Sequence, residues 1–169
     1  MKNLRIWSLL CLIWMGVLAA SAQDTGKEKI SLGDAMPAIT LSSEIYGKVT
    51  PADLKGKVVL VSLFATWCGP CKKSMQSMVP LKKNLSSKDI VYIYLTGPSS
   101  PENIWKSNLS KMTGVHYRLT DSQWKYLCTS YGVTGIPAYL IISHDGKLQG
   151  RYVGFPGRCT AKGPDSCNR

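Results

Sequence analysis

The sequence predicts an α/β fold in which a central mixed β-sheet is flanked by helices. Two runs, Val58–Phe64 and Ile90–Leu95, are apolar almost throughout, which is typical of strands buried on both faces of a sheet. A helical pattern lies between them, so strand, helix and strand predict a parallel unit with a right-handed crossover. Two later strand candidates are joined through Asp145-Gly146, which predicts an antiparallel hairpin.

With 169 residues the chain is long enough for one domain with a core, and no second domain is needed. We expect this domain to span residues 38–154, after a polar lead-in at residues 23–37. Residues 155–169 form a polar tail that contains Gly, Pro, Lys and Asp and has no amphipathic pattern. A C-terminal helix is therefore not expected.

Residues 1–22 have the pattern of a secretory signal peptide. A positively charged start precedes an apolar stretch, and Ala20-Ser21-Ala22 is a small-x-small site, so we expect cleavage before Gln23. The protein is therefore predicted to be exported, to the periplasm. The alternative is an uncleaved membrane anchor through residues 4–22, for which the apolar stretch is short.

Two short strand candidates, Ala38–Leu41 and Ile45–Thr50, lie around Gly47-Lys48 and ahead of the first buried strand. The segment Asp53–Lys57 that follows them is rich in turn residues.

After the first buried strand, the helical pattern begins at Trp67-Cys68-Gly69-Pro70-Cys71. Met75, Met78 and Val79 follow with helical spacing and are expected to face the core. Pro80 is expected to end or kink this helix, because proline lacks the N–H that an interior helical residue donates.

Further along, Ser100-Pro101-Glu102 predicts a helix with Ser100 as its N-cap, and Val115–Leu119 is a candidate for a short extra strand. The strands of the hairpin are Ala138–Ile142 and Leu148–Val153, and Ile136-Pro137 stands directly before the first of them.

Another helix is predicted from about Asp121 to Gly132. Its apolar stripe is formed by Trp124, Leu127, Cys128 and Tyr131. Because Cys128 lies in this stripe, we expect it to be a core residue and not a redox partner.

Cys68 and Cys71 have the spacing of a redox-active pair. A disulfide that closes so small a loop stabilises a fold by only about 2 kcal/mol, so stability is a poor reason for it. Cys68 is placed at a helix N-terminus, which favours its thiolate, and Cys71 follows as the resolving thiol. Pro70 limits the turn between them, and Trp67 would flank the reactive sulfur as an apolar docking surface.

The composition is basic, with a formal net charge of +11. The lysines are spread along the chain and an exported protein rarely meets DNA, so no nucleic-acid partner is expected. A Cys-x-x-Cys pair is also half of a zinc site, but His116 and His144 show no ligand spacing with it. We therefore expect no metal site.

Several motifs besides the cysteine pair carry a family resemblance. They are the leader, Gly47-Lys48-Val49, Leu54–Val61, Phe64–Trp67, Trp67–Lys72 and Gly135-Ile136-Pro137. In this combination the chain resembles the exported TlpA/ResA-type thiol-disulfide oxidoreductases, which have the thioredoxin fold. The resemblance covers residues 32–154.

The resemblance implies roles for residues far from the pair in sequence. In this fold the proline before the later strand is cis and lies against the cysteines, which here implies Pro137. The backbone of Ile136 would then pair with an incoming substrate strand. Gly69 and Pro70 between the cysteines resemble thioredoxin, which is reducing.

We therefore expect a monomeric reductase of disulfides in exported proteins, without a cofactor. It would be recharged by a membrane thiol-electron carrier, with cytochrome c precursors as one possible client. The alternative from another class is a module in which reduced Cys68 and Cys71 bind or deliver copper.

This chain departs from the family pattern in three places. Ser62 stands where thioredoxins carry a buried acid, and Ser74 stands where many exported relatives carry a glutamate. The proton acceptor for Cys71 is therefore left open. The usual C-terminal helix is missing, and the tail offers Cys159 and Cys167, which form a small disulfide or stay unpaired.

Overall fold

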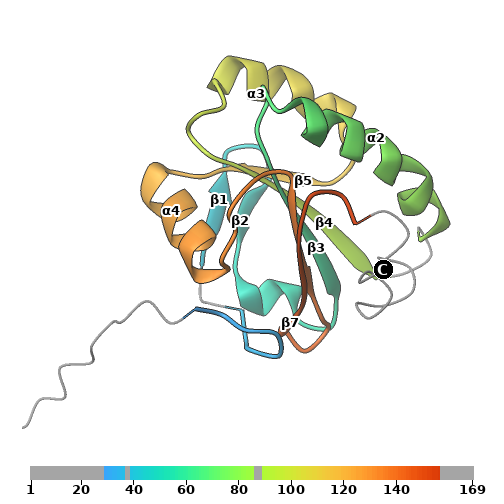
Figure 1. Ribbon diagram of the computed structural model, residues 1–169, viewed down its shortest axis with the longest axis vertical. Coiled ribbons are helices and arrows are strands. Elements are labelled where there is room, and N and C mark those ends of the chain that lie inside the picture. The colour runs from blue at the N-terminus through green and yellow to red at the C-terminus, as the bar shows by residue number, and fades with distance from the viewer. Residues whose placement is uncertain (1–28, 37–38, 86–88, 157–169) are drawn as a thin grey trace, which may run out of the picture.

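A computed structural model describes residues 29–36, 39–85 and 89–156 of the chain. A five-stranded sheet with the order β5-β4-β3-β6-β7 forms its centre (Figure 1). The strands are β3 (Val58–Phe64), β4 (Ile90–Thr96), β5 (Val115–Arg118), β6 (Ala138–Ile142) and β7 (Leu148–Val153). The predicted leader, the tail from residue 157 onward, and Cys159 and Cys167 lie outside the described residues.

The central strand β3 pairs in parallel with β4 and antiparallel with β6. On the outer sides, β5 is parallel to β4 and β7 is antiparallel to β6. The sheet is therefore mixed, and both the parallel unit and the hairpin predicted from the sequence are confirmed.

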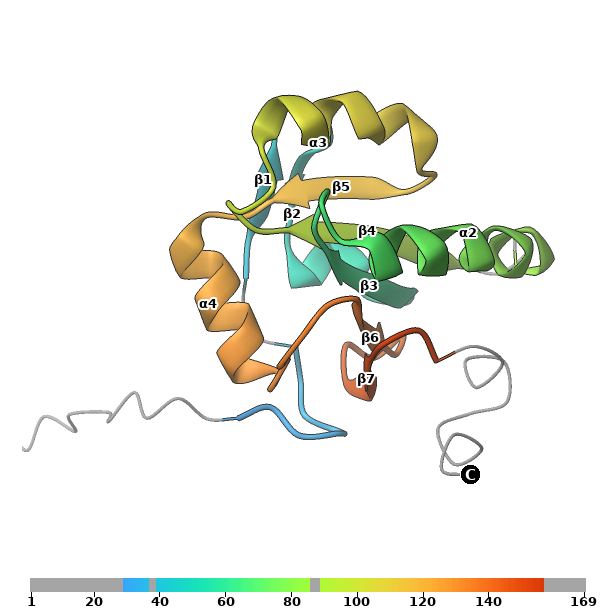
Figure 2. The ribbon, with the colours of Figure 1, turned by 45° about the horizontal axis from the view of Figure 1, so that its top comes forward.

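Helices cover both faces of the sheet, as Figures 1 and 2 show. They are α2 (Gly69–Asn84), α3 (Glu102–Asn108) and α4 (Asp121–Ser130), with short 3₁₀ turns η1 (Pro51–Leu54) and η2 (Leu109–Lys111). In the part of the chain that the structure describes, no helix is both long and apolar enough to cross a bilayer.

Alternate residues of each central strand pack into different clusters. Ile93 and Leu95 of β4 belong to the larger apolar cluster, which includes Leu127 of α4. Tyr94 belongs to the smaller cluster, which includes Trp105 of α3 and the two cysteines at the start of α2. Because both faces of the sheet are covered, the sequences of β3 and β4 are apolar almost throughout and do not alternate with polar residues.

The first two strands differ from the prediction. They are β1 (Leu41–Ser43) and β2 (Gly47–Val49), so the first begins where the predicted strand was expected to end. The Ser43 hydroxyl accepts hydrogen bonds from the backbone N–H groups of Ile45, at 3.2 Å, and Tyr46, at 3.4 Å. This local turn reverses the chain between the strands.

Helix α2 differs from the prediction in two respects. It continues through Pro80 to Asn84. Proline has no N–H to donate to the carbonyl four residues earlier, but Pro80 is exposed, so water can hydrogen-bond to that carbonyl instead. Val79 is 64% exposed, although its spacing predicted a core position. The reason is that Val79 lies on the side of the helix that lines a cavity.

Helix α3 begins one residue later than expected. Pro101, and not Ser100, occupies its N-cap position, because the Ser100 hydroxyl is bonded elsewhere. Helix α4 matches its prediction. Its N-cap is Thr120, whose hydroxyl accepts the N–H of Gln123 at 3.2 Å, while the Gln123 side chain accepts the N–H of Thr120.

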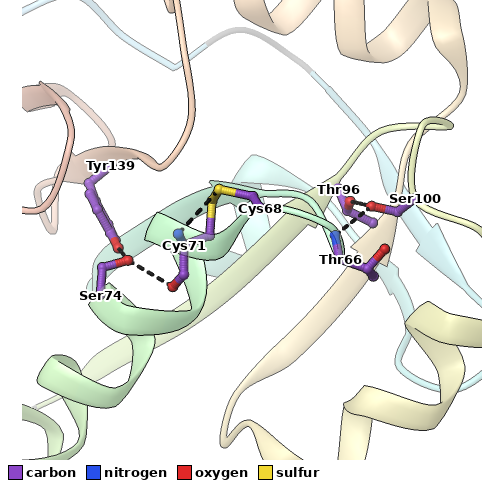
Figure 3. The surroundings of a disulfide bond; sticks show 7 residues. All are labelled: Thr66, Cys68, Cys71, Ser74, Thr96, Ser100 and Tyr139. Carbon is purple, nitrogen blue, oxygen red and sulfur yellow. Dashed lines mark hydrogen bonds between the residues drawn. A yellow bond between two sulfur atoms is a disulfide. The ribbon is translucent and has the colours of Figure 1, made fainter.

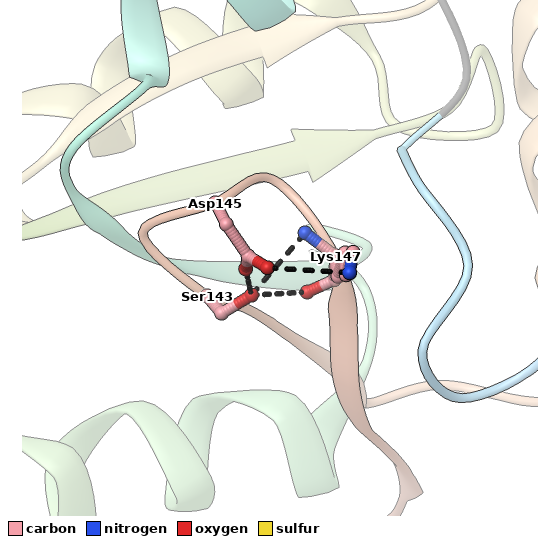
Figure 4. A network of polar contacts seen from close by, with 3 residues as sticks. All are labelled: Ser143, Asp145 and Lys147. Atoms are coloured by element: carbon pink, nitrogen blue, oxygen red, sulfur yellow. Dashed lines mark hydrogen bonds and ion pairs between the residues drawn. The ribbon is translucent and has the colours of Figure 1, made fainter.

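The turn of the β6–β7 hairpin is held by its own side chains (Figure 4). The Ser143 hydroxyl donates to the Asp145 carboxylate and accepts the backbone N–H of Lys147 at 3.2 Å. Gly146 has a φ of 82°, which suits glycine. Residues 33–36 run beside this hairpin, and Ala35 forms a β-bridge with Lys147.

His116 of β5 is completely buried and stacks on Tyr94 with ring centroids 4.7 Å apart. Its Nε2 lies 3.1 Å from the Met112 carbonyl, so the neutral ring donates there. Its Nδ1 has no hydrogen-bond partner among the described residues. Burial lowers the pKa of His116, so the ring stays neutral at pH values where an exposed histidine is protonated.

We predict that His116 makes the fold sensitive to acid. Below about pH 6.5 the unfolded chain takes up a proton that the folded chain does not, and the free energy of unfolding falls by up to about 1.4 kcal/mol per pH unit. In the His116→Gln variant, the amide can still donate to Met112 but does not titrate. The loss of stability between about pH 7 and about pH 5, measured by urea unfolding, should therefore be smaller.

The matched control is His144→Gln, because His144 is exposed in the hairpin turn. An equal loss of stability on acidification in the wild type and in His116→Gln would contradict this prediction.

Candidate redox site

Cys68 and Cys71 form a disulfide at the N-terminus of α2. The S–S distance is 2.05 Å and the Cα atoms are 5.2 Å apart. Cys68 is 4% exposed and Cys71 is 1% exposed, so the pair is held within the smaller apolar cluster. The structure thus brings together the two cysteines that the sequence singled out.

Cys68 is the N-cap residue of α2, and its Sγ accepts the backbone N–H of Cys71 at 3.2 Å. The first N–H groups of a helix have no partner inside the helix, and the helix dipole is positive at this end. Both effects favour a thiolate on Cys68 when the disulfide is reduced.

The other residues of the motif surround the pair on its exposed side. Trp67 is 63% exposed directly before Cys68. Gly69 and Pro70 form the exposed first turn of α2, where the missing N–H of proline costs no helical hydrogen bond. An apolar side chain therefore lies in solvent beside the disulfide.

The segment that leads into the motif is fixed by polar contacts from the end of β4 (Figure 3). The Ser100 hydroxyl accepts the backbone N–H of Thr66 at 3.0 Å and lies 2.6 Å from the Thr96 hydroxyl. Arg118 of β5 donates to the Ser100 carbonyl at 3.1 Å. Sequence reasoning missed this role of Ser100, although a signal was available. Parallel neighbours such as β3 and β4 bring the segments after their C-terminal ends together.

Ile136 and Pro137 lead into β6, and the peptide bond between them is cis. Pro137 is buried. Ile136 is half-buried and packs against the cluster that holds Cys68 and Cys71. The segment expected to face the cysteines therefore lies beside their cluster.

Ser74 connects α2 to β6 (Figure 3). Its hydroxyl donates to the Cys71 carbonyl at 2.8 Å and accepts the hydroxyl of Tyr139, also at 2.8 Å. Both side chains are buried, and burial raises the pKa of Tyr139. In the sequence, Ser74 was noted only because many exported relatives carry a glutamate at this position. Tyr139, which lies two residues after Pro137, was not identified.

Ser62, the second position where an acid was absent, is also buried. Among the described residues, the buried polar side chains are serines, threonines and one histidine, with no carboxylate. In place of a buried acid, α2 therefore has a neutral polar contact next to Cys71, the hydroxyl pair of Ser74 and Tyr139.

Cys128 lies apart from the pair. It is half-buried on α4, is not disulfide-bonded, and packs against the larger apolar cluster. Burial raises the pKa of its thiol, which disfavours the reactive thiolate. Its place in the core agrees with the sequence analysis.

We predict that the Ser74–Tyr139 pair stabilises the fold as a unit. Ser74→Ala leaves the buried Tyr139 hydroxyl without its acceptor and should lower the free energy of unfolding by about 1–3 kcal/mol. The double variant Ser74→Ala/Tyr139→Phe removes both partners and should be more stable than Ser74→Ala alone. Denaturant unfolding of the oxidised proteins measures both effects.

Ser77→Ala is the control, because Ser77 is exposed on the same helix and donates to the Lys73 carbonyl at 3.2 Å. The prediction is wrong if Ser74→Ala and Ser77→Ala destabilise the protein equally.

The fold agrees with known structures. The thioredoxin domain of a thiol-disulfide oxidoreductase from Bacteroides vulgatus superposes with a TM-score of 0.65 and 23% identity, covering 75% of this chain and 91% of that domain. A thiol:disulfide interchange protein from Bacteroides sp. gives a TM-score of 0.66 and 21% identity, with coverage of 79% and 88%. The chain therefore has the thioredoxin fold.

Sequence comparison leads to the same class of protein. The thiol-disulfide oxidoreductase ResA of Bacillus subtilis (strain 168) is 30% identical over 146 residues, which cover 86% of this chain and 80% of ResA. This confirms the resemblance inferred from the motifs. The family model described as Redoxin matches residues 31–162. The chain belongs to the Redoxin family.

Proposed function

We propose that Cys68 and Cys71 are the reacting residues of this protein, and that it reduces disulfides in exported proteins. The chain is a thiol-disulfide oxidoreductase, as its family and its cysteine pair show. The observation that carries the assignment of Cys68 is its place as the N-cap of α2, with the N–H of Cys71 directed at its sulfur.

In the reducing direction, the Cys68 thiolate attacks one sulfur of a client disulfide. A bond forms between Cys68 and that sulfur, and the second client sulfur leaves as a thiolate. The Cys71 thiol then loses its proton and attacks Cys68, which releases the first client sulfur as a thiolate. The two released thiolates take up protons, the client gains two electrons, and the Cys68–Cys71 disulfide is restored.

The surroundings of the pair support the docking of a polypeptide client. Trp67 offers an exposed apolar surface beside the disulfide, and Ile136 packs against the cysteine cluster from the opposite segment. We propose that the client strand lies between these residues and pairs with the backbone at Ile136. Gly69 and Pro70 are small residues in the exposed first turn of α2, so they leave room for the client strand beside the disulfide.

The direction of electron flow and the place of action are also proposals. The Gly-Pro dipeptide resembles that of thioredoxin, whose potential of about −270 mV is reducing. We propose a periplasmic enzyme, cleaved before Gln23 and re-reduced by a membrane thiol-electron carrier. Cytochrome c precursors are one client class that fits this place.

The rival hypothesis, copper binding by the reduced pair, has less support. Within residues 29–36, 39–85 and 89–156, no three Cys, His, Asp or Glu side chains gather in a group that could hold a metal ion.

We predict that the purified protein reduces insulin and that Cys68→Ser abolishes this activity. Cys71→Ala should instead accumulate mixed disulfides with clients, because Cys68 still attacks and no thiol resolves the product. Non-reducing electrophoresis and mass spectrometry identify the trapped clients.

The mass of the exported chain checks cleavage before Gln23.

Metal content, measured after purification under reducing conditions, is the control for the rival hypothesis. Stoichiometric copper together with no insulin reduction would overturn the enzyme assignment.

We also predict a reducing potential for the pair. Equilibration with reduced and oxidised glutathione, followed by quantification of the free thiols of Cys68 and Cys71, should give a midpoint near that of thioredoxin, about −270 mV. A midpoint above about −180 mV would make the protein an oxidase or isomerase instead.

A further inference from the structure

A cavity of about 730 Å³ lies along the side of α2 that faces away from Ser74 and Tyr139. Its volume is within the range of small-molecule sites, about 300–1,000 Å³. Half of its lining residues are apolar or aromatic, and these are Phe64, Ala65, Met75, Val79, Leu85, Ile90, Tyr92, Tyr94 and Met112. The proposed docking of a polypeptide client at Trp67 and Ile136 does not use this cavity.

One wall of the cavity is a single stripe of α2. Cys71, Met75, Val79 and Lys82 follow one another at helical spacing and all line it. Lys82 is three turns beyond Cys71, which places it about 16 Å further along the helix axis. The cavity is therefore elongated, with a sulfur at one end and an ammonium group at the other.

The end near Cys71 is largely apolar, with the exposed Lys72 beside it. Phe64 and Ala65 are buried in the same cluster as Cys71, and Met75 and Met112 pack against it. A polypeptide backbone placed here would lose the hydrogen bonds that its amides make with water. A hydrocarbon chain loses none, so this end favours an aliphatic group.

The opposite end carries positive charge. The Lys82 Nζ lies 4.5 Å from the centroid of the Tyr92 ring and 4.6 Å from that of Tyr94. It donates to the Tyr94 hydroxyl and to the Thr113 carbonyl, and both of these partners are neutral. Burial lowers the pKa of Lys82 to about 8, so the ammonium form predominates at neutral pH.

No Asp or Glu is among the residues that line this cavity, whereas three further lysines are. These are Lys72, Lys83 and Lys111, which are exposed. The lining therefore supplies cations but no anion, and its charge is complementary to a negatively charged ligand.

We propose that this cavity binds a free long-chain carboxylate, with the carboxylate at Lys82 and the acyl chain directed towards Cys71. Each methylene that enters the apolar end should strengthen binding about fourfold.

The test is calorimetric titration of the full chain, with Cys68 and Cys71 oxidised, using dodecanoate as the probe. Dodecanoate should bind at a stoichiometry of one and more tightly than octanoate, while dodecanol should bind at least about tenfold more weakly. Lys82→Met should weaken dodecanoate binding by about tenfold or more, because it removes the charge and keeps an unbranched side chain.

A second variant guards against misfolding of Lys82→Met. Val79 lines the cavity but is 64% exposed, so Val79→Glu adds a carboxylate there without disturbing the core, and it should also weaken binding. Lys125→Met is the matched control, because Lys125 lies on α4 in an exposed ion pair with Asp121. It should bind dodecanoate like the wild type.

Equal binding of dodecanol and dodecanoate, or wild-type affinity in Val79→Glu, would overturn the proposal. Binding to anionic vesicles or to an acidic peptide without binding of monomeric dodecanoate would also overturn it. None of these outcomes bears on insulin reduction by the cysteine pair, so the two proposals fail separately.

Discussion

The burial of β3 on both faces and both edges is the constraint on which the redox site depends. Its neighbours β4 and β6 hold it from either side, and helices cover it above and below. The chain that leaves this strand has little freedom in position or direction. The N-terminus of α2, and Cys68 with it, is thereby placed at one edge of a rigid sheet.

Local contacts complete what the sheet begins. Ser100 holds the backbone at Thr66 just before the motif, and Ser74 with Tyr139 holds the first turn of α2 just after it. One contact comes from the segment after β4 and the other from β6, and they lie on opposite sides of the disulfide (Figure 3). Short neutral hydroxyls make both of them, so the site is positioned without burying a carboxylate among the described residues.

The fold was predictable from the sequence wherever a pattern is local. The apolar runs of β3 and β4, the stripe of α4 and the Asp145-Gly146 turn each report the environment of their own segment. The cysteine pair was predictable for the same reason. The hydrogen bond from Thr66 to Ser100 was not found, because no local pattern reports a contact between residues so far apart in the sequence. The predicted parallel pairing of β3 and β4 implied only that the two segments meet.

Helix α2 shows the same limit in another way. Periodicity identifies the side that carries Met75 and Val79 but cannot tell whether a sheet or an open cavity lies opposite. The cavity depends on the relative positions of α2, β4 and η2, which no single stretch of sequence encodes. Tyr139 was missed because its partner Ser74 is on a distant element.

Helix α2 separates the Ser74–Tyr139 contact from the cavity. On one side it presents Ser74 to β6, and on the other it presents Met75 to the cavity, while Cys71 belongs to the boundary between them. The two sides share a backbone but no side chain. Substitutions can therefore alter what enters the cavity while the contacts that hold the first turn stay unchanged. Protein engineering can change the two sides of the helix separately.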